Sequence, residues 1–193
     1  MELASSTAAA SWIERSLWPW ERPWLRAGSV IPEGFTAYAR IVHPSERESE
    51  PFTGSLPRPA AERLVDVLRG FTFAADRCWF GIWDGFGFLD QDRYEPVPKV
   101  RVPNRAYLLF QGPIDVIKSM EWNLSWQTPN LWWPEDRSWC VATEIDLAET
   151  YVGGSDACIA RILEDRGLDA FPMRLDARII DGHAVDPEES PMS

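Results

Sequence analysis

The stretch PNLWWPEDRSWCVATEID runs from Pro129 to Asp146 and joins three tryptophans, an acidic turn and an apolar segment. In an extended segment from Ser138 onward, Trp139, Val141 and Ile145 would lie on one face and Glu144 and Asp146 on the other, which indicates a strand. The prolines on both sides of the first two tryptophans indicate a stiff connection before that strand. We therefore predict a strand over residues 138–147 and a tryptophan-rich loop over residues 121–137.

The loop and strand together supply the candidate binding residues. Neighbouring side chains of an extended segment diverge, so at least one of Trp132 and Trp133 must cover the sheet. The other is the candidate for an exposed contact, because tryptophan is enriched at the centres of protein interfaces. The acidic turn would form a polar rim, and the two acids at the end of the strand would share one face. The predicted binding set is Trp132, Trp133, Glu135, Asp136, Arg137, Glu144 and Asp146.

Other segments predict the rest of the fold. Strands are expected over residues 35–44, 78–84 and 106–112, and helices over residues 59–70, 113–120 and 155–167. AYLLFQG (106–112) is apolar on both faces, so we expect an interior strand. The pattern predicts a single α+β domain with a mixed or antiparallel sheet of four or more strands, helices mainly on one face and long Pro/Trp-rich loops.

The ends of the chain differ from its middle. Residues 1–28 are rich in tryptophan and proline and predict an N-terminal arm, whose first ten residues are expected to be disordered. Residues 29–175 would form the domain. Residues 176–193 are polar and acidic and predict a loose tail.

The charge of the chain limits its partners. The formal net charge is −11, and residues 134–193 alone carry 14 acidic and 5 basic residues. Duplex nucleic acid is bound by neutralising phosphates with Lys and Arg, so no nucleic-acid partner is expected, nor an anionic membrane. The charge favours a protein partner with a basic surface. The alternative is that it serves solubility alone.

The cysteines indicate the compartment. Cys78, Cys140 and Cys158 are odd in number and include no C-x-x-C pair. We expect three unpaired thiols, at least two of them buried, in a cytoplasmic protein. The first residues lack the positive region of a secretory signal, and no apolar run approaches the ~20 residues of a membrane span.

Catalytic material is sparse. WDGFG lacks the third glycine of a dinucleotide-binding turn, and no serine elbow is present. The two histidines, His43 and His183, lie far apart and offer little for zinc. Glu144 and Asp146 would do acid–base work only if a pocket raised the pKa of one of them, and solvation at the strand end is the alternative. We therefore assign no catalytic residue, metal ligand or cofactor.

Five blocks of sequence carry a resemblance to a family. YARIVHP, CWFGIWDGFG, YLLFQGP, PNLWWPEDRSWCVATEID and TYVGGS, in this order, resemble a family of uncharacterised proteins from GC-rich bacteria. The resemblance covers roughly residues 29–172 and implies that this span is one domain. It implies no activity, cofactor or catalytic residue.

Two functions from different classes remain open. The first is a non-catalytic cytoplasmic binding module, immunity-type or regulatory, that presents an acidic, tryptophan-bearing face to a protein partner. The second is a small-molecule enzyme or sensor, which requires a concave apolar cavity of several hundred Å³. Its pocket would be lined by Trp83, Trp132 and Trp139, with Arg137, Glu144 and Asp146 as polar groups.

Overall fold

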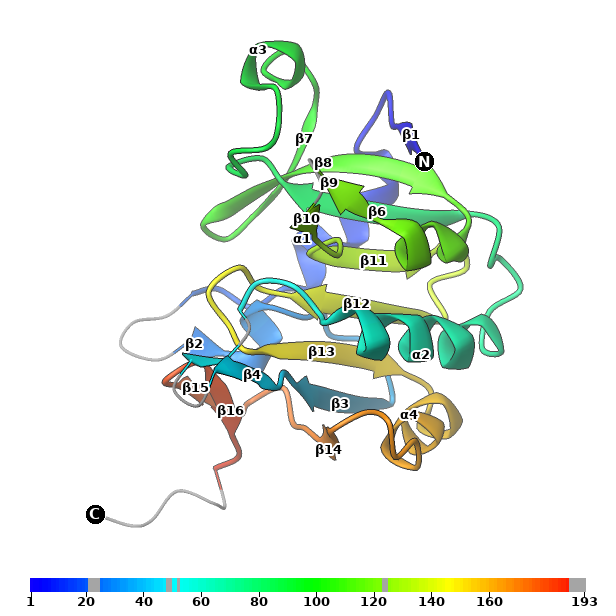
Figure 1. The fold of residues 1–193 in the computed structure, drawn as a ribbon, viewed down its shortest axis with the longest axis vertical. Coiled ribbons are helices and arrows are strands. Elements are labelled where there is room, and N and C mark those ends of the chain that lie inside the picture. The colour runs from blue at the N-terminus through cyan, green and yellow to red at the C-terminus, as the bar shows by residue number, and fades with distance from the viewer. Residues whose placement is uncertain (21–24, 48–49, 52, 123–124, 188–193) are drawn as a thin grey trace.

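An antiparallel sheet forms the centre of the protein (Figure 1). The structure is a computed structural model that describes residues 1–20, 25–47, 50–51, 53–122 and 125–187. The strands of the sheet follow in space as β1 (Glu2–Leu3), β8 (Arg105–Gly112), β6 (Cys78–Trp83), β11 (Leu131–Pro134), β12 (Trp139–Thr143), β13 (Glu149–Gly154), β3 (Ala37–Val42) and β14 (Ala170–Pro172), while β7 (Lys99–Val102) also pairs with β8.

Smaller elements surround this sheet. A second sheet consists of the short strands β2 (Leu25–Arg26), β15 (Arg178–Ile180) and β16 (His183–Val185). Two separate strand pairs are β4 (Ser45–Arg47) with β5 (Glu50–Pro51), and β9 (Glu121–Trp122) with β10 (Ser125–Trp126). The α-helices are α1 (Ser11–Ser16), α2 (Arg58–Arg69), α3 (Gln91–Tyr94) and α4 (Asp156–Leu163), and the 3₁₀ helices are η1 (Ala8–Ala10), η2 (Ala27–Ser29) and η3 (Ile114–Ser119). Within the described ranges, every helix is too short or too polar to cross a membrane.

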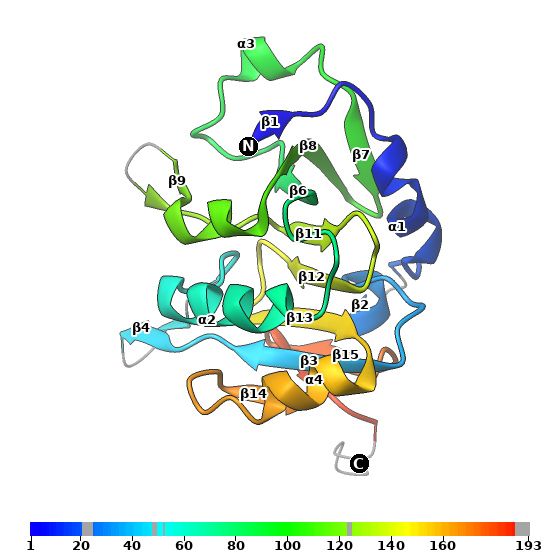
Figure 2. The same ribbon diagram turned by 90° about the vertical axis from the view of Figure 1, so that its right-hand side faces the viewer.

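The sheet has an apolar core on each face. Helices α2, η3 and α4 cover one face, as Figure 2 shows, and the N-terminal segment with β15 and β16 covers the other. The interior position predicted for AYLLFQG is confirmed, because β8 lies between β6 and the edge pair β7 and β1. Its residues Leu108 and Leu109 are 0% and 1% exposed and belong to different cores.

The tryptophan pair divides between these two cores. Trp132 packs edge to face against Trp139, with ring centres 5.5 Å apart, on the face that α2 covers. Trp133 packs against Trp12 at 6.1 Å on the opposite face. Both side chains of the pair are at most 1% exposed. The expected exposed tryptophan is therefore wrong: the sheet has a covering layer on each side, so each of the two diverging side chains enters a core.

Local sequence explains the two α-helices that cover one face of the sheet. Helix α2 starts with Pro59 in its first turn and buries Leu64 and Leu68 on one side. Helix α4 is capped by Ser155, whose hydroxyl accepts a hydrogen bond from the Cys158 N–H at 3.2 Å. The two helices lie side by side on the same face (Figure 2).

Three expectations about loops and ends are corrected by the structure. Residues 1–10 are not disordered, because β1 pairs with β8 and Ala10 is fully buried. Residues 176–187 are not a loose tail, because β15 and β16 pair with each other and β15 pairs with β2. The expected loop over residues 121–137 contains three short strands, of which β11 is interior. Residues 21–24 of the arm and 188–193 of the tail lie outside the described residues.

Candidate functional site

The predicted binding residues separate into two groups at opposite ends of β12. The exposed turn before β12 contains Glu135, Asp136 and Arg137. The segment after Thr143, the last residue of β12, contains Glu144 and Asp146. The two acids were expected to share a strand face, but β12 stops at Thr143 and they lie in the next turn. The set therefore does not form one continuous face, and each end must be considered separately.

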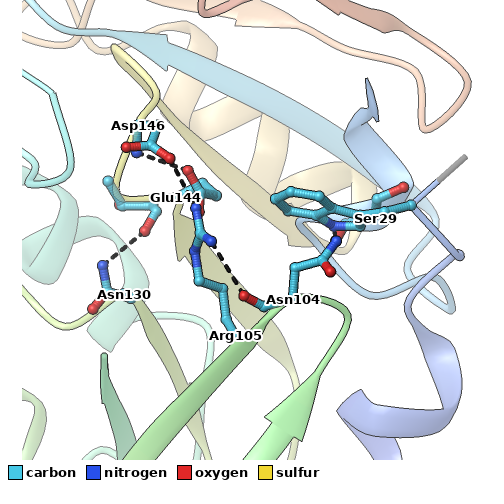
Figure 3. Close-up of polar contacts among 8 residues, drawn as sticks. Ser29, Asn104, Arg105, Asn130, Glu144 and Asp146 are labelled. Carbon is cyan, nitrogen blue, oxygen red and sulfur yellow. Dashed lines mark hydrogen bonds and ion pairs between the residues drawn. The ribbon is translucent and has the colours of Figure 1, made fainter. Parts of the chain in front are cut away.

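At the end of β12, Arg105 gathers both acids (Figure 3). Its Nε–H donates to Glu144 Oε1 at 2.6 Å, and its Nη2–H donates to Asp146 Oδ2 at 2.8 Å. Glu144 also accepts the Asp146 N–H at 2.7 Å. The Glu144 side chain is 5% exposed, whereas that of Asp146 is 75% exposed. Of these two acids, Glu144 alone is buried, and Arg105 compensates its charge.

Aromatic rings and an amide close this end. The Arg105 guanidinium lies 5.4 Å from the ring centre of Trp20 and 6.0 Å from that of Trp83. The side chain of Asn130 accepts a hydrogen bond from the Trp83 N–H at 2.9 Å and donates to the Thr143 carbonyl at 3.1 Å. These contacts leave a small cavity of about 10 Å³, room for roughly one water molecule. Arg105 thus occupies the position from which a ligand would meet the two carboxylates.

The pocket required for a small-molecule enzyme or sensor does not form at these residues. Trp132 and Trp139 lie in the core beneath α2, whereas Trp83 belongs to the opposite face of the sheet. Asp84, the residue after β6, forms an ion pair with Lys99 at 3.3 Å. Within the described ranges, no three His, Cys, Asp or Glu side chains are grouped to hold a metal ion.

The turn at the other end of β12 positions a loop with an exposed aromatic side chain. Asp136 Oδ2 accepts hydrogen bonds from the Phe73 N–H at 2.9 Å and from the Thr72 hydroxyl at 2.8 Å. Its Oδ1 accepts both the Ser138 N–H at 3.1 Å and the Ser138 hydroxyl at 2.7 Å. One carboxylate therefore ties the loop after α2 to the β11–β12 turn. The side chain of Phe73 at the tip of this loop is fully exposed.

The ionised form of Asp136 is favoured in this arrangement. Partial burial opposes ionisation, but the hydrogen bonds from Ser138, Thr72 and the Phe73 N–H outweigh it and lower the pKa of Asp136. Two further contacts join the same segments, because Arg77 Nε–H donates to Glu135 Oε2 at 2.5 Å and the Glu135 N–H donates to the Arg77 carbonyl at 2.9 Å. The backbone that presents Phe73 is thus fixed from both sides.

Arg137 does not belong to this surface. It adopts a positive φ of 54°, and its guanidinium lies 5.4 Å from the ring centre of Trp12. Trp12 packs with Trp133 in the core on the opposite face of the sheet. Of the predicted polar rim, Glu135 and Asp136 therefore lie beside Phe73, while Arg137 covers the N-terminal segment.

The three thiols are unpaired and buried, as predicted. Burial raises the pKa of both Cys78 and Cys158 to about 12. Burial also raises the pKa of Cys140. Since the thiolate is the reactive form, none of them is suited to act as a nucleophile at neutral pH.

Phe73 was not among the predicted site residues. Phe73 lies after Gly70, the residue that ends α2, and belongs to no amphipathic pattern. The sequence offers no other indication that its side chain is exposed. We define the Phe73 face as Phe73, Asp76, Arg77, Glu135 and Asp136, all of which are exposed. Comparisons with known protein families, with curated proteins and with solved structures found no match for this chain.

Proposed function

We propose that the protein is a non-catalytic binding module that presents the Phe73 face to a protein partner. The observation that carries this proposal is a fully exposed phenylalanine on a loop that Asp136 fixes through two hydrogen bonds, while two more from Ser138 hold the carboxylate itself. Burying such a side chain in a partner is worth about 1.5–3 kcal/mol. Because the loop is already fixed by the fold, little backbone entropy is lost when it binds.

The charges of the Phe73 face favour a basic partner. Asp76, Glu135 and Asp136 carry negative charge, and Arg77 is the one basic residue of the face and pairs with Glu135. Such a face attracts a cationic surface and speeds its association. The partner best suited to it has an apolar pocket for Phe73 with arginine or lysine around the rim.

The cellular role remains that of an immunity-type or regulatory module in the cytoplasm. Three observations support it: the unpaired, buried thiols, the net charge of −11, and the closed geometry around Glu144. A buried ion pair beside a cavity of only about 10 Å³ offers little to a substrate. The binding face, by contrast, lies on an exposed loop, where interaction residues are commonly found.

The proposal is tested by partner capture with matched variants. Wild-type protein, Phe73→Ser and Phe171→Ser are used to capture partners from extracts of the source cells, and the captured protein is then titrated against each. Phe171 is the control, because it is a half-exposed phenylalanine on β14 in a different part of the molecule. We expect Phe73→Ser alone to weaken binding by at least about tenfold. Equal binding by all three proteins would show that the Phe73 face is not the recognition surface.

A further inference from the structure

An apolar pocket lies where β3 ends and α2 begins, and the turn between α4 and β14 forms its third wall. Its volume is about 460 Å³, which falls within the roughly 300–1,000 Å³ of small-molecule sites. The apolar part of the lining is aliphatic and includes Val42, Pro44, Pro57, Pro59, Ala60 and Leu168. A pocket of this size and lining suits the aliphatic group of a small molecule.

The walls of this pocket are fixed by the fold. Three of the lining residues are prolines, whose rings restrict the backbone and whose nitrogens carry no N–H. The Val42 N–H donates to the Asp169 carbonyl at 2.9 Å and so joins the end of β3 to the turn. The Leu168 N–H donates to the Asp165 carbonyl at 2.9 Å, and the Leu168 side chain is buried in the core that α2 covers. A preformed wall loses little entropy when a ligand binds to it.

Two exposed charged residues, Arg166 and Asp169, also line the pocket. Within the described ranges, neither side chain forms an ion pair or a hydrogen bond, although the two residues are only three positions apart. The groove between α2 and α4 differs in this respect, because Arg63 and Arg161 both pair there with Asp165. The pocket at the start of α2 therefore keeps one positive and one negative group available to a ligand.

We propose that this pocket binds a free aliphatic amino acid such as leucine. A site with one positive and one negative group matches a zwitterion, whereas a simple anion or cation would meet one like charge. The ligand carboxylate would pair with Arg166 and its ammonium group with Asp169, while its side chain would lie against the proline-lined wall. Both pairs would be charge-assisted hydrogen bonds, which are the stronger kind. The net charge of −11 further disfavours a simple anion.

This inference goes beyond the proposed function and does not rest on it. The pocket is at the first turn of α2, whereas the Phe73 loop follows the last residue of that helix. A helix of 12 residues is about 18 Å long. An amino acid in the pocket would therefore not contact the Phe73 face, and the two sites can be tested separately.

The test is isothermal titration calorimetry of the wild-type protein with leucine at up to about 10 mM, a range suited to weak ligands. Three related compounds each lack one feature of leucine. Glycine lacks the aliphatic side chain, leucinamide lacks the carboxylate, and N-acetyl-leucine lacks the ammonium group. We expect each compound to bind at least about fivefold more weakly than leucine, since each loses one of the three contacts.

Two variants assign the charged contacts to residues. Arg166→Gln and Asp169→Asn change exposed side chains without altering the core, so both proteins should fold. Leucine and leucinamide should bind equally to Arg166→Gln, because the partner of the carboxylate is gone. Leucine and N-acetyl-leucine should bind equally to Asp169→Asn for the same reason. The matched control is Arg161→Gln, an exposed arginine outside the pocket, which should bind leucine as wild type does.

Three results would each overturn the inference. The first is that wild type does not bind leucine, and the second is that all four compounds bind alike. The third is that Arg166→Gln and Asp169→Asn bind leucine as tightly as wild type. Partner capture that depends on Phe73 would stand in each of these cases, because it concerns the other end of α2.

Discussion

The two ends of β12 each hold a carboxylate, but they stabilise its charge in different ways. At each end a carboxylate accepts several hydrogen bonds beside an aromatic residue. At one end Glu144 is buried, so it requires the charged Arg105, and two tryptophan rings cover the pair. At the other end Asp136 is exposed, so backbone N–H groups and hydroxyls suffice, and Phe73 is left in water.

This difference supports the proposal that the open end, rather than the closed end, is the surface for recognition. A closed end gains its stability from groups that satisfy one another, and opening it would strand a buried charge. The open end gains little from Phe73 itself, since its fully exposed side chain buries no apolar surface against the described residues. An aromatic side chain that does not serve the fold is the better candidate for recognition.

Substitutions in β11, the strand that pairs with β12, should have the largest effects on the free energy of unfolding. Trp132→Ala and Trp133→Ala should each lower the free energy of unfolding by about 3–5 kcal/mol, because each leaves a large cavity in a separate core. Urea denaturation of the two variants measures this loss, with Phe73→Ala as the control. A loss below about 1 kcal/mol for either tryptophan would mean that its side chain is not buried as described here.

Breaking the closed end should cost nearly as much. Arg105→Ala removes the partner of the buried Glu144 carboxylate, and we expect a loss of about 3–5 kcal/mol in unfolding free energy. The matched control is Arg63→Ala, since the Arg63 side chain is half exposed and its ion pair with Asp165 should contribute at most about 1 kcal/mol. If both changes had equal effects, the distinction between a closed and an open site would fail.

The clamp at the open end should have an intermediate effect. Asp136→Ala removes the acceptor of four hydrogen bonds, and we expect it to lower the unfolding free energy by about 1–3 kcal/mol. Phe73 would lose its fixed position, so binding through the Phe73 face should weaken as well. Hydrogen exchange at the Phe73 amide should become faster in this variant.

The pH dependence of the clamp follows from the lowered pKa of Asp136. A group whose pKa is lower in the folded protein stabilises the fold above its unfolded pKa, and this contribution is lost as the pH falls through the folded value. The difference in stability between wild type and Asp136→Asn should therefore be constant at neutral pH and shrink only below the ordinary value of 3.8. A difference that already shrinks at neutral pH would contradict the lowered pKa.

The α+β architecture was predictable because its signals are local, whereas the sequence left a mixed and an antiparallel sheet open. AYLLF is apolar at every position, which indicates burial on both faces. Ser155 is a typical N-cap residue and indicates the start of α4. The interior strand β11 was missed because a four-residue segment between prolines resembles a stiff loop. Only its two partners, β6 and β12, turn the prolines into the ends of a strand.

The candidate site was predicted less well, because its formation depends on distant residues. Asp136 contacts residues more than 60 positions away in the sequence, and Arg105 reaches Glu144 across 39 positions. Arg105 is an arginine at the start of a strand, and nothing local in the sequence identifies it as the partner of a buried acid. The exposure of Phe73 likewise results from how the loop docks, which no periodic pattern reveals.

Phe73→Ser should have the smallest effect on the fold and a large effect on binding. The Phe73 side chain is fully exposed, so the substitution removes no buried apolar surface. The unfolding free energy should therefore stay within about 0.5 kcal/mol of wild type. Affinity for a captured partner should fall by at least about tenfold, mainly through faster dissociation, because the anchor is lost while the acids remain.

Reversing Glu135 to Lys should instead slow association and weaken its dependence on salt. Surface plasmon resonance at two salt concentrations separates the two rates, and a destabilised Phe73→Ser would show that this residue serves the core after all.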